Sequence, residues 1–160
     1  QLMKKEVQQV SSFEEWNVGD LKVLEQDLLN AAHAACKNAY APYSNFRVGS
    51  AVLLKSGRTV IGSNQENMAY PSGLCAERVA FFSAGAQFPG DDIVAAAVVT
   101  DINMPLEHFS PCGGCRQVMV ESELRQKKPI RFLMQAGDSN VLVSPDVIRF
   151  LPLAFQLPAR

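Results

Sequence analysis

The 160-residue sequence has little net charge of either sign. Its 15 Lys and Arg residues and 16 Asp and Glu residues give a formal net charge of −1. Proteins that bind a polynucleotide neutralise its phosphates with clustered cations, often with aromatic residues between them. The densest basic group here, Arg125–Arg131, contains no aromatic residue. We therefore expect no nucleic-acid partner.

Long apolar runs are also missing. No stretch approaches the roughly 18 apolar residues that a membrane-spanning helix requires. The first ten residues, QLMKKEVQQV, have neither the apolar centre nor the small-residue cleavage site of a secretory signal. These absences predict a cytoplasmic protein with no membrane partner.

No repeat, low-complexity tract or linker divides the chain. Apolar residues make up 48% of the sequence, which is enough for one packed core. The first helical pattern begins at Asp20. We therefore expect an N-terminal extension over residues 1–19 and a single domain over residues 20–160.

The pattern of apolar residues predicts a layered α/β fold. Helical spacing runs from Asp20 to Lys37, with Asp20 as the N-cap. A hairpin signature follows, and Ser144-Pro145 is expected to open a short C-terminal helix. The strands are expected over residues 48–54, 59–62, 93–100, 130–135 and 140–143, and the two middle helices over residues 75–86 and from 111 to about 124. Five strands that alternate with helices predict a sheet covered by helices on both faces.

The four cysteines do not indicate a disulfide scaffold, because a chain of this length can bury its own core. Cys112 and Cys115 have a C-x-x-C spacing. In an intracellular protein, cysteines with this spacing are more often metal-binding or redox-active than joined in a disulfide. Cys36 lies late in the first helix and is expected to be a small packing residue.

Cys75, Cys112 and Cys115 each fall at the predicted start of a helix. Free amide N–H groups and the helix dipole favour anionic sulfur at such positions. If the two helix starts meet, three thiolates surround one point. Three protein ligands without an obvious fourth are typical of a catalytic zinc site that keeps one position for water.

Glu77 and Arg78 follow Cys75 directly. Glu77 is rotated about 200° from Cys75 on a regular helix, so it is a poor metal ligand, but it is suited to move a proton to or from water at the site. Arg78 is suited to offset the surplus negative charge of three thiolates on one Zn²⁺.

The residues alone leave alternatives open. The C-x-x-C pair fits a redox site, and His108, four residues before Cys112, fits a closed structural Cys₃His site. Glu77 and Arg78 also fit an ordinary acid and an ordinary surface base in a first helical turn.

Cys75-Ala76-Glu77 together with Pro111-Cys112-x-x-Cys115 is similar to the signature of the zinc deaminases, in its all-cysteine form. The longer strings CAER (75–78) and PCGGCRQ (111–117) resemble the small homotetrameric cytidine deaminases. The segments YSNFRVG (43–49), NQEN (64–67) and FLPLAF (150–155) strengthen the likeness, which runs from about Asp20 to Phe155.

This resemblance implies a three-layer α/β/α sandwich around a mixed five-stranded sheet. It also implies one Zn²⁺ per subunit, held by Cys75, Cys112 and Cys115, with Glu77 as the catalytic proton shuttle and Arg78 bonded to the thiolates. The residues that it implies for substrate binding are Phe46 against the nucleoside, Asn64 and Glu66 on the ribose 3′-hydroxyl, the backbone of Ala76 on the base, and Phe155 from a neighbouring subunit of a homotetramer.

The activity that the resemblance implies is hydrolysis of cytidine and 2′-deoxycytidine to the uridines and ammonia, in pyrimidine salvage. Two rival functions remain. One is deamination of another or a modified nucleoside, and the other is a structural zinc module that binds a partner.

Overall fold

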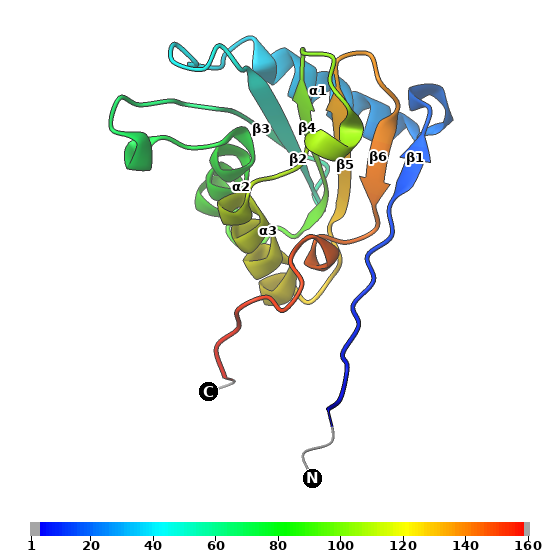
Figure 1. The fold of residues 1–160 in the computed structure, drawn as a ribbon. Coiled ribbons are helices and arrows are strands. Elements are labelled where there is room, and N and C mark those ends of the chain that lie inside the picture. Colours follow the sequence, from blue (N-terminus) through cyan, green and yellow to red (C-terminus); the bar gives the residue numbers. More distant parts are fainter. Residues whose placement is uncertain (1–3, 159–160) are drawn as a thin grey trace.

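The computed structural model describes residues 4–158, so residues 1–3 of the expected N-terminal extension and residues 159–160 lie outside it. One six-stranded sheet runs through the molecule in the order β1-β6-β5-β4-β2-β3 (Figure 1). The pair β4–β5 is parallel and all the other pairs are antiparallel. The strands are β1 (Glu14–Trp16), β2 (Val48–Leu54), β3 (Thr59–Ser63), β4 (Ile93–Thr100), β5 (Arg131–Ala136) and β6 (Val141–Ser144).

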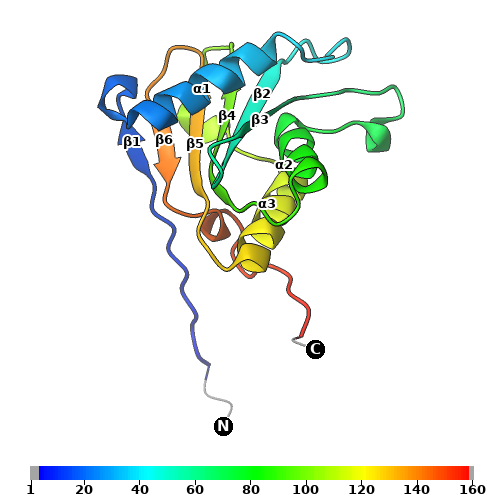
Figure 2. The ribbon, with the colours of Figure 1, turned by 180° about the vertical axis from the view of Figure 1, so that it is seen from behind.

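Helices cover both faces of this sheet. Helix α1 (Val23–Cys36) lies on one face, and α2 (Ala76–Gln87) and α3 (Gly113–Gln126) lie together on the other (Figures 1 and 2). Two buried apolar clusters correspond to the two interfaces. One contains Leu28, Leu29 and Ala32 of α1, and the other contains Phe81 of α2 and Met119 of α3. The predicted three-layer α/β/α sandwich around a mixed sheet is confirmed.

The sheet has six strands, whereas the sequence predicted five. The additional strand is β1, which lies within the expected N-terminal extension and pairs with β6 through Glu14, Glu15 and Trp16. Only three residues take part, and two of them are charged, so no alternating apolar pattern marks this strand in the sequence.

The predicted start of the first helix was wrong. Asp20 ends a short 3₁₀ helix, η1 (Val18–Asp20), and α1 begins at Val23 with Lys22 as its N-cap. The carboxylate of Glu25 accepts the backbone N–H of Lys22 at 3.1 Å, which satisfies a donor that the helix itself leaves free. Glu25 therefore places the N-cap of α1 at Lys22, two residues after the N-cap that the sequence predicted at Asp20.

The expected C-terminal helix is only a 3₁₀ turn, η4 (Ile148–Phe150). The carboxylate of Glu123 on α3 accepts the N–H groups of Val147 and Ile148 at 2.9 and 3.2 Å. The turn does not continue into a helix because Pro152 lacks an N–H group and disfavours helical backbone at Leu151, whose φ and ψ are −130° and 80°.

Two glycines let the helices approach the sheet closely. A Cβ atom on Gly62 of β3 would lie 2.5 Å from the Ala80 N atom and 2.7 Å from the Ala76 O atom of α2. Gly49 of β2 faces the backbone of α1 at Ala32 in the same way. Within residues 4–158, no helix has both the length and the apolar character needed to cross a bilayer.

Candidate active site

The first turns of α2 and α3 carry the three cysteines that the sequence singled out. Cys75 is the N-cap of α2, Cys112 is the N-cap of α3, and Cys115 is the third residue of α3. Both helices lie on the same face of the sheet (Figure 2). The structure therefore brings together residues that stand about 40 positions apart in the chain.

The three sulfur atoms have the spacing of metal ligands. Cys112 Sγ lies 3.7 Å from Cys75 Sγ and 3.5 Å from Cys115 Sγ, and all three lie within 4.8 Å of one another. Tetrahedral zinc with bonds of about 2.3 Å places its sulfur ligands about 3.8 Å apart. All three thiols are free. This donor set therefore fits Zn²⁺ and leaves one coordination position without a protein ligand.

Helix termini and a guanidinium favour anionic sulfur at this point. The pKa of the Cys75 thiol is lowered to about 5, first because the Cys115 thiol donates a hydrogen bond to it and then because Arg78 does. The Arg78 Nη2 atom lies 3.6 Å from Cys75 Sγ. The buried Nε atom of Arg78 has no partner among the described residues, so the guanidinium keeps a donor available beside the sulfur atoms. The Cys75 thiolate is therefore stabilised before a metal binds, whereas the pKa of the Cys115 thiol is raised, first by its hydrogen bond to Cys75 and then by burial.

Glu77 is a buried carboxyl next to this cluster. It is 5% exposed, and burial raises its pKa to about 7. A carboxyl group with a pKa near neutrality can both accept and donate a proton, which suits a general acid–base catalyst. Its oxygen atoms do not belong to the group of three potential metal ligands found among the described residues.

A cavity of about 300 Å³ opens beside the cysteines and Glu77. Four of the predicted substrate-binding residues line it, together with Glu77 and two of the cysteines: Phe46, Asn64, Glu66, Ala76, Glu77, Cys75 and Cys112. Ala76 is the first residue of α2, so its backbone N–H has no acceptor within the helix. A neighbouring cavity of about 400 Å³ shares Asn64 and Glu66 and is also lined by Arg78.

Asn64 and Glu66 also hold the loop that carries Phe46. The Asn64 side-chain amide donates to Phe46 O at 2.8 Å and accepts from Val48 N at 2.9 Å. The Glu66 carboxylate accepts the backbone N–H groups of Tyr43 and Ser44 at 3.0 and 3.2 Å, as well as the Ser44 hydroxyl. These contacts, first the Ser44 hydroxyl, lower the pKa of Glu66. Both side chains therefore shape the wall of the cavity.

The structure does not bring every predicted residue to this cavity. Phe155 is 70% exposed and lines a different hollow, on the outer surface of α2 and α3, beside Phe82 and Gln117. His108 lines the cavity, but it does not belong to the group of three sulfur atoms, so the described residues do not form a closed Cys₃His site. Cys36 is fully buried and donates to Val99 O at 3.4 Å, as its expected packing role requires.

Several residues of the site have no recognisable signal in the sequence. Phe109 packs against Phe46 with ring centroids 6.4 Å apart, and Met104 and Ser110 complete the cavity wall. These three residues come from loops, whose conformation no hydrophobic periodicity predicts. Tyr43, from the segment YSNFRVG, packs edge to face on Tyr70 at 6.3 Å, and both line the neighbouring cavity.

An open three-thiolate site beside a buried carboxyl, at the helix starts of a layered α/β fold, defines the class of zinc-dependent hydrolytic enzymes. Sequence comparison gives the family. Residues 22–128 match the family described as the cytidine and deoxycytidylate deaminase zinc-binding region, and the chain belongs to this family.

Individual relatives agree with this assignment. A cytidine deaminase of Sporosarcina psychrophila is 38% identical over 130 residues, which cover 81% of this chain and 90% of the relative. One from Halalkalibacterium halodurans is 47% identical over 96 residues, covering 60% of this chain and 70% of the relative. The crystal structure of the cytidine deaminase from Burkholderia pseudomallei superimposes with a TM-score of 0.71 at 41% identity, covering 81% of this chain and 97% of that one.

Proposed function

We propose that this protein is a zinc-dependent cytidine deaminase, which hydrolyses cytidine and 2′-deoxycytidine to uridine and 2′-deoxyuridine with release of ammonia. The observation that carries the proposal is the buried Glu77 carboxyl, with a pKa of about 7, beside three thiols spaced as zinc ligands. The relatives named as cytidine deaminases support the choice of substrate.

Cys75, Cys112 and Cys115 would hold the zinc ion in this reaction. When bound, zinc supplies a Lewis acid that lowers the pKa of water and makes it a nucleophile at neutral pH. The Glu77 carboxylate takes a proton from the water that attacks C4 and delivers it to N3 of the ring. Glu77 then takes the remaining proton from the new C4 hydroxyl and transfers it to the amino group, so that the C4 carbonyl forms as the C4–N bond breaks and ammonia leaves.

The remaining cavity residues would hold the nucleoside. In this proposal the Ala76 backbone contacts the base and the Phe46 ring packs against the nucleoside. The side chains of Asn64 and Glu66 hydrogen-bond the 3′-hydroxyl. Asn64 and Glu66 each line both cavities. Because these contacts are directed to the 3′ position, we expect little discrimination between cytidine and 2′-deoxycytidine.

The charges around the site favour a nucleoside over a nucleotide. Among the described residues that line the two cavities, Arg78 and His108 are the basic ones, and Arg78 is engaged with Cys75. The carboxylate of Glu66 stands in both cavities. A phosphate group would therefore meet a negative charge without a dedicated cation. This argues against the other substrate class in the family description, deoxycytidylate.

The proposal extends to the assembly and its setting. Phe155 is exposed and lines a hollow other than the cavity of its own chain, so in a homotetramer it would complete the site of a neighbouring subunit. The three ligand thiols must stay reduced, which the cytoplasm provides. Pyrimidine salvage in the cytoplasm is the corresponding role.

Loss of cytidine absorbance in the presence of purified protein tests the proposed activity. We expect turnover of cytidine and 2′-deoxycytidine, no turnover of their 5′-monophosphates, and loss of activity in Cys112→Ala. Glu77→Gln should retain zinc and the fold while kcat falls by about 10²- to 10⁴-fold, because proton transfer is lost. A Glu77→Gln enzyme near the wild-type rate would overturn the mechanism. Turnover of adenosine or of a modified cytidine in place of cytidine would overturn the substrate.

A further inference from the structure

Arg116 stands directly after Cys115 in the first turns of α3 and binds three oxygen atoms at once. Its Nε atom donates to Pro111 O at 2.7 Å and its Nη2 atom to Ser110 Oγ at 2.9 Å. Its Nη1 atom donates to Phe150 O at 3.0 Å. One half-buried guanidinium thus ties the two residues before Cys112 to the C-terminal turn.

The segment that Arg116 holds determines where Cys112 lies. Cys112 is exposed, has an extended backbone with ψ of 166°, and makes no side-chain cap to its helix. Its own carbonyl accepts the backbone N–H of Arg116 at 2.9 Å. This last bond is a helical backbone bond that any residue at position 116 would make, so the Arg116 side chain acts on Cys112 through Ser110 and Pro111, which precede it. Burial fixes Cys115 independently. Of the two cysteines on α3, Cys112 is the one that needs a support from outside its own side chain.

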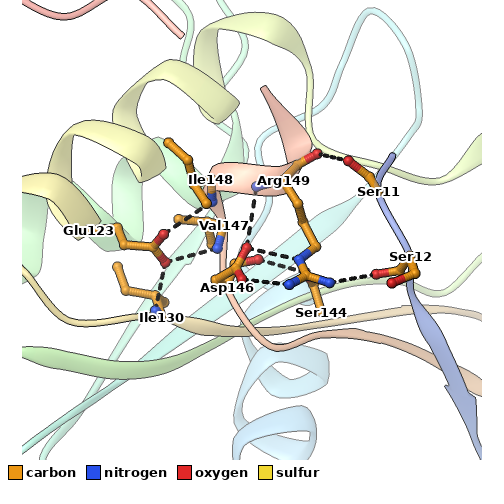
Figure 3. A network of polar contacts seen from close by, with 9 residues as sticks. All are labelled: Ser11, Ser12, Glu123, Ile130, Ser144, Asp146, Val147, Ile148 and Arg149. Atoms are coloured by element: carbon orange, nitrogen blue, oxygen red, sulfur yellow. Dashed lines mark hydrogen bonds and ion pairs between the residues drawn. The ribbon is translucent and has the colours of Figure 1, made fainter. Parts of the chain in front are cut away.

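The third oxygen atom that Arg116 binds is the carbonyl of Phe150. The residues just before Phe150 are held by a network of polar contacts, which Figure 3 shows. Glu123 accepts the backbone N–H groups of Ile130, Val147 and Ile148, and Asp146 pairs with Arg149 (Figure 3). The N-terminal segment closes over the same turn. Ser11 Oγ donates to Arg149 O, and Arg149 Nη1 donates to Ser12 O, both at 2.8 Å.

The Phe13 ring then packs on the Phe150 ring at 5.0 Å. The Phe150 carbonyl is thus a rigid anchor for the guanidinium. A side chain that joins a rigid anchor to a loop restricts that loop, and such supporting contacts orient metal ligands in proteins.

We propose that Arg116 is a positioning residue for the metal site: its guanidinium fork holds Ser110–Cys112 so that the Cys112 sulfur stands at ligand distance from the other two before the metal binds. This inference rests on the proposed zinc site. The positioning role requires the forked shape of the arginine side chain, because a planar guanidinium can bind three separate acceptors in fixed directions and a lysine ammonium cannot.

Cobalt titration of the zinc-free, reduced protein tests this proposal, with the thiolate-to-Co²⁺ charge-transfer bands and the d–d bands as readouts. We expect Arg116→Lys and Arg116→Ala to bind Co²⁺ about 10- to 100-fold more weakly than the wild type and to show altered d–d bands. Arg125→Lys is the matched control, because Arg125 is an exposed arginine on the same helix, and it should behave as the wild type. Ser110→Ala removes one acceptor of the fork at an exposed position and should weaken Co²⁺ binding in the same direction.

The outcomes distinguish failure of the proposed zinc site from failure of the positioning role of Arg116. If the wild type binds no Co²⁺, or if Cys112→Ala leaves its spectrum unchanged, the proposed zinc site fails. If the wild type binds Co²⁺ but Arg116→Lys matches its affinity and spectrum, the positioning role fails. If Arg116→Lys is normal and Arg116→Ala is weak, charge alone matters and the fork argument is wrong. Should Arg116→Ala not fold, Arg116→Lys and Ser110→Ala decide the question.

Discussion

At the scale of single residues, the same thiol group serves two opposite purposes in this chain. Cys75 stands at a helix start beside Arg78 and a second thiol, and its pKa is lowered to about 5. Cys36 lies in the core between α1 and the sheet, where burial raises its pKa to about 12. One environment favours the thiolate that a metal requires, and the other excludes it.

The buried Cys36 thiol predicts a pH-dependent contribution to stability. An unfolded thiol ionises near pH 8.5, whereas the folded pKa is raised to about 12. The contribution of the protonated thiol is therefore complete below about pH 8.5 and is lost as the pH rises toward 12. The free energy of unfolding lost in Cys36→Ala should thus be smaller at pH 9.5 than at pH 7, by about 1.4 kcal/mol.

Urea unfolding of the zinc-saturated wild type and of Cys36→Ala at the two pH values measures this difference. The other three cysteines are common to both proteins, so their ionisation cancels. Equal differences at pH 7 and pH 9.5 would contradict the raised pKa of Cys36.

At the scale of elements, the seating of α2 on the sheet determines where Cys75 and Glu77 lie. Helix α2 packs on β3 at Gly62, where the helix backbone comes closer than any side chain would allow. Because Cys75 is the N-cap of this helix, any displacement of the helix moves the sulfur atom relative to those on α3. The metal site thus depends on a glycine that does not line it.

Gly62→Ala should therefore weaken both the fold and the site. The new Cβ atom would meet the Ala80 N and Ala76 O atoms, which are backbone atoms that cannot rotate away. We expect a loss of about 1–3 kcal/mol in the free energy of unfolding, measured in urea, together with weaker Co²⁺ binding. Gly85→Ala on the same helix is the control: nothing lies within 4 Å of its Cβ position, and it should be neutral or stabilise the protein by up to about 1 kcal/mol. A Gly62→Ala protein as stable as the wild type would refute the seating argument.

Elements with a strong pattern could be predicted from the sequence, and elements held by side chains could not. The apolar run IVAAAVVT predicted β4 with its observed bounds, Ile93–Thr100, because a strand buried on both faces needs apolar residues throughout. Strand β1, by contrast, is placed by its pairing with β6 and by the packing of Trp16 against the buried cluster under α1. The turn η4 depends on the distant carboxylate of Glu123.

The same distinction holds within the site. The three cysteines and Glu77 could be singled out because their chemistry and their place at helix starts are local properties, and the structure brings them together. The bond from Ser44 to Glu66 joins two loops, and the bond from Arg116 to Phe150 joins α3 to η4. Only the folded chain specifies these contacts.

At the scale of the whole molecule, Phe155 lies apart from the site to which the family resemblance assigns it. Its ring is 70% exposed, on the outer surface of α2 and α3 near the exposed Phe82. Residues that precede it are held firmly, since Phe150 packs between Phe13 and Phe132. The chain is thus anchored just before it presents an aromatic side chain outward, as a subunit that completes its neighbour's site would require.

Mixing of two inactive variants tests this assembly directly. In the proposed homotetramer, Phe155→Ala chains retain Glu77, and Glu77→Gln chains retain Phe155. Each variant alone should have low kcat/KM, but a tetramer that contains both should include sites with Glu77 from one chain and Phe155 from the next. We therefore expect the co-expressed, purified mixture to regain cytidine deamination well above the sum of the two separate proteins, with light scattering to confirm a tetramer. If Phe155 acted within its own chain, every site in the mixture would lack one of the two groups, and no activity would return. The rescue thus depends on the arrangement of subunits and on no property of a single chain.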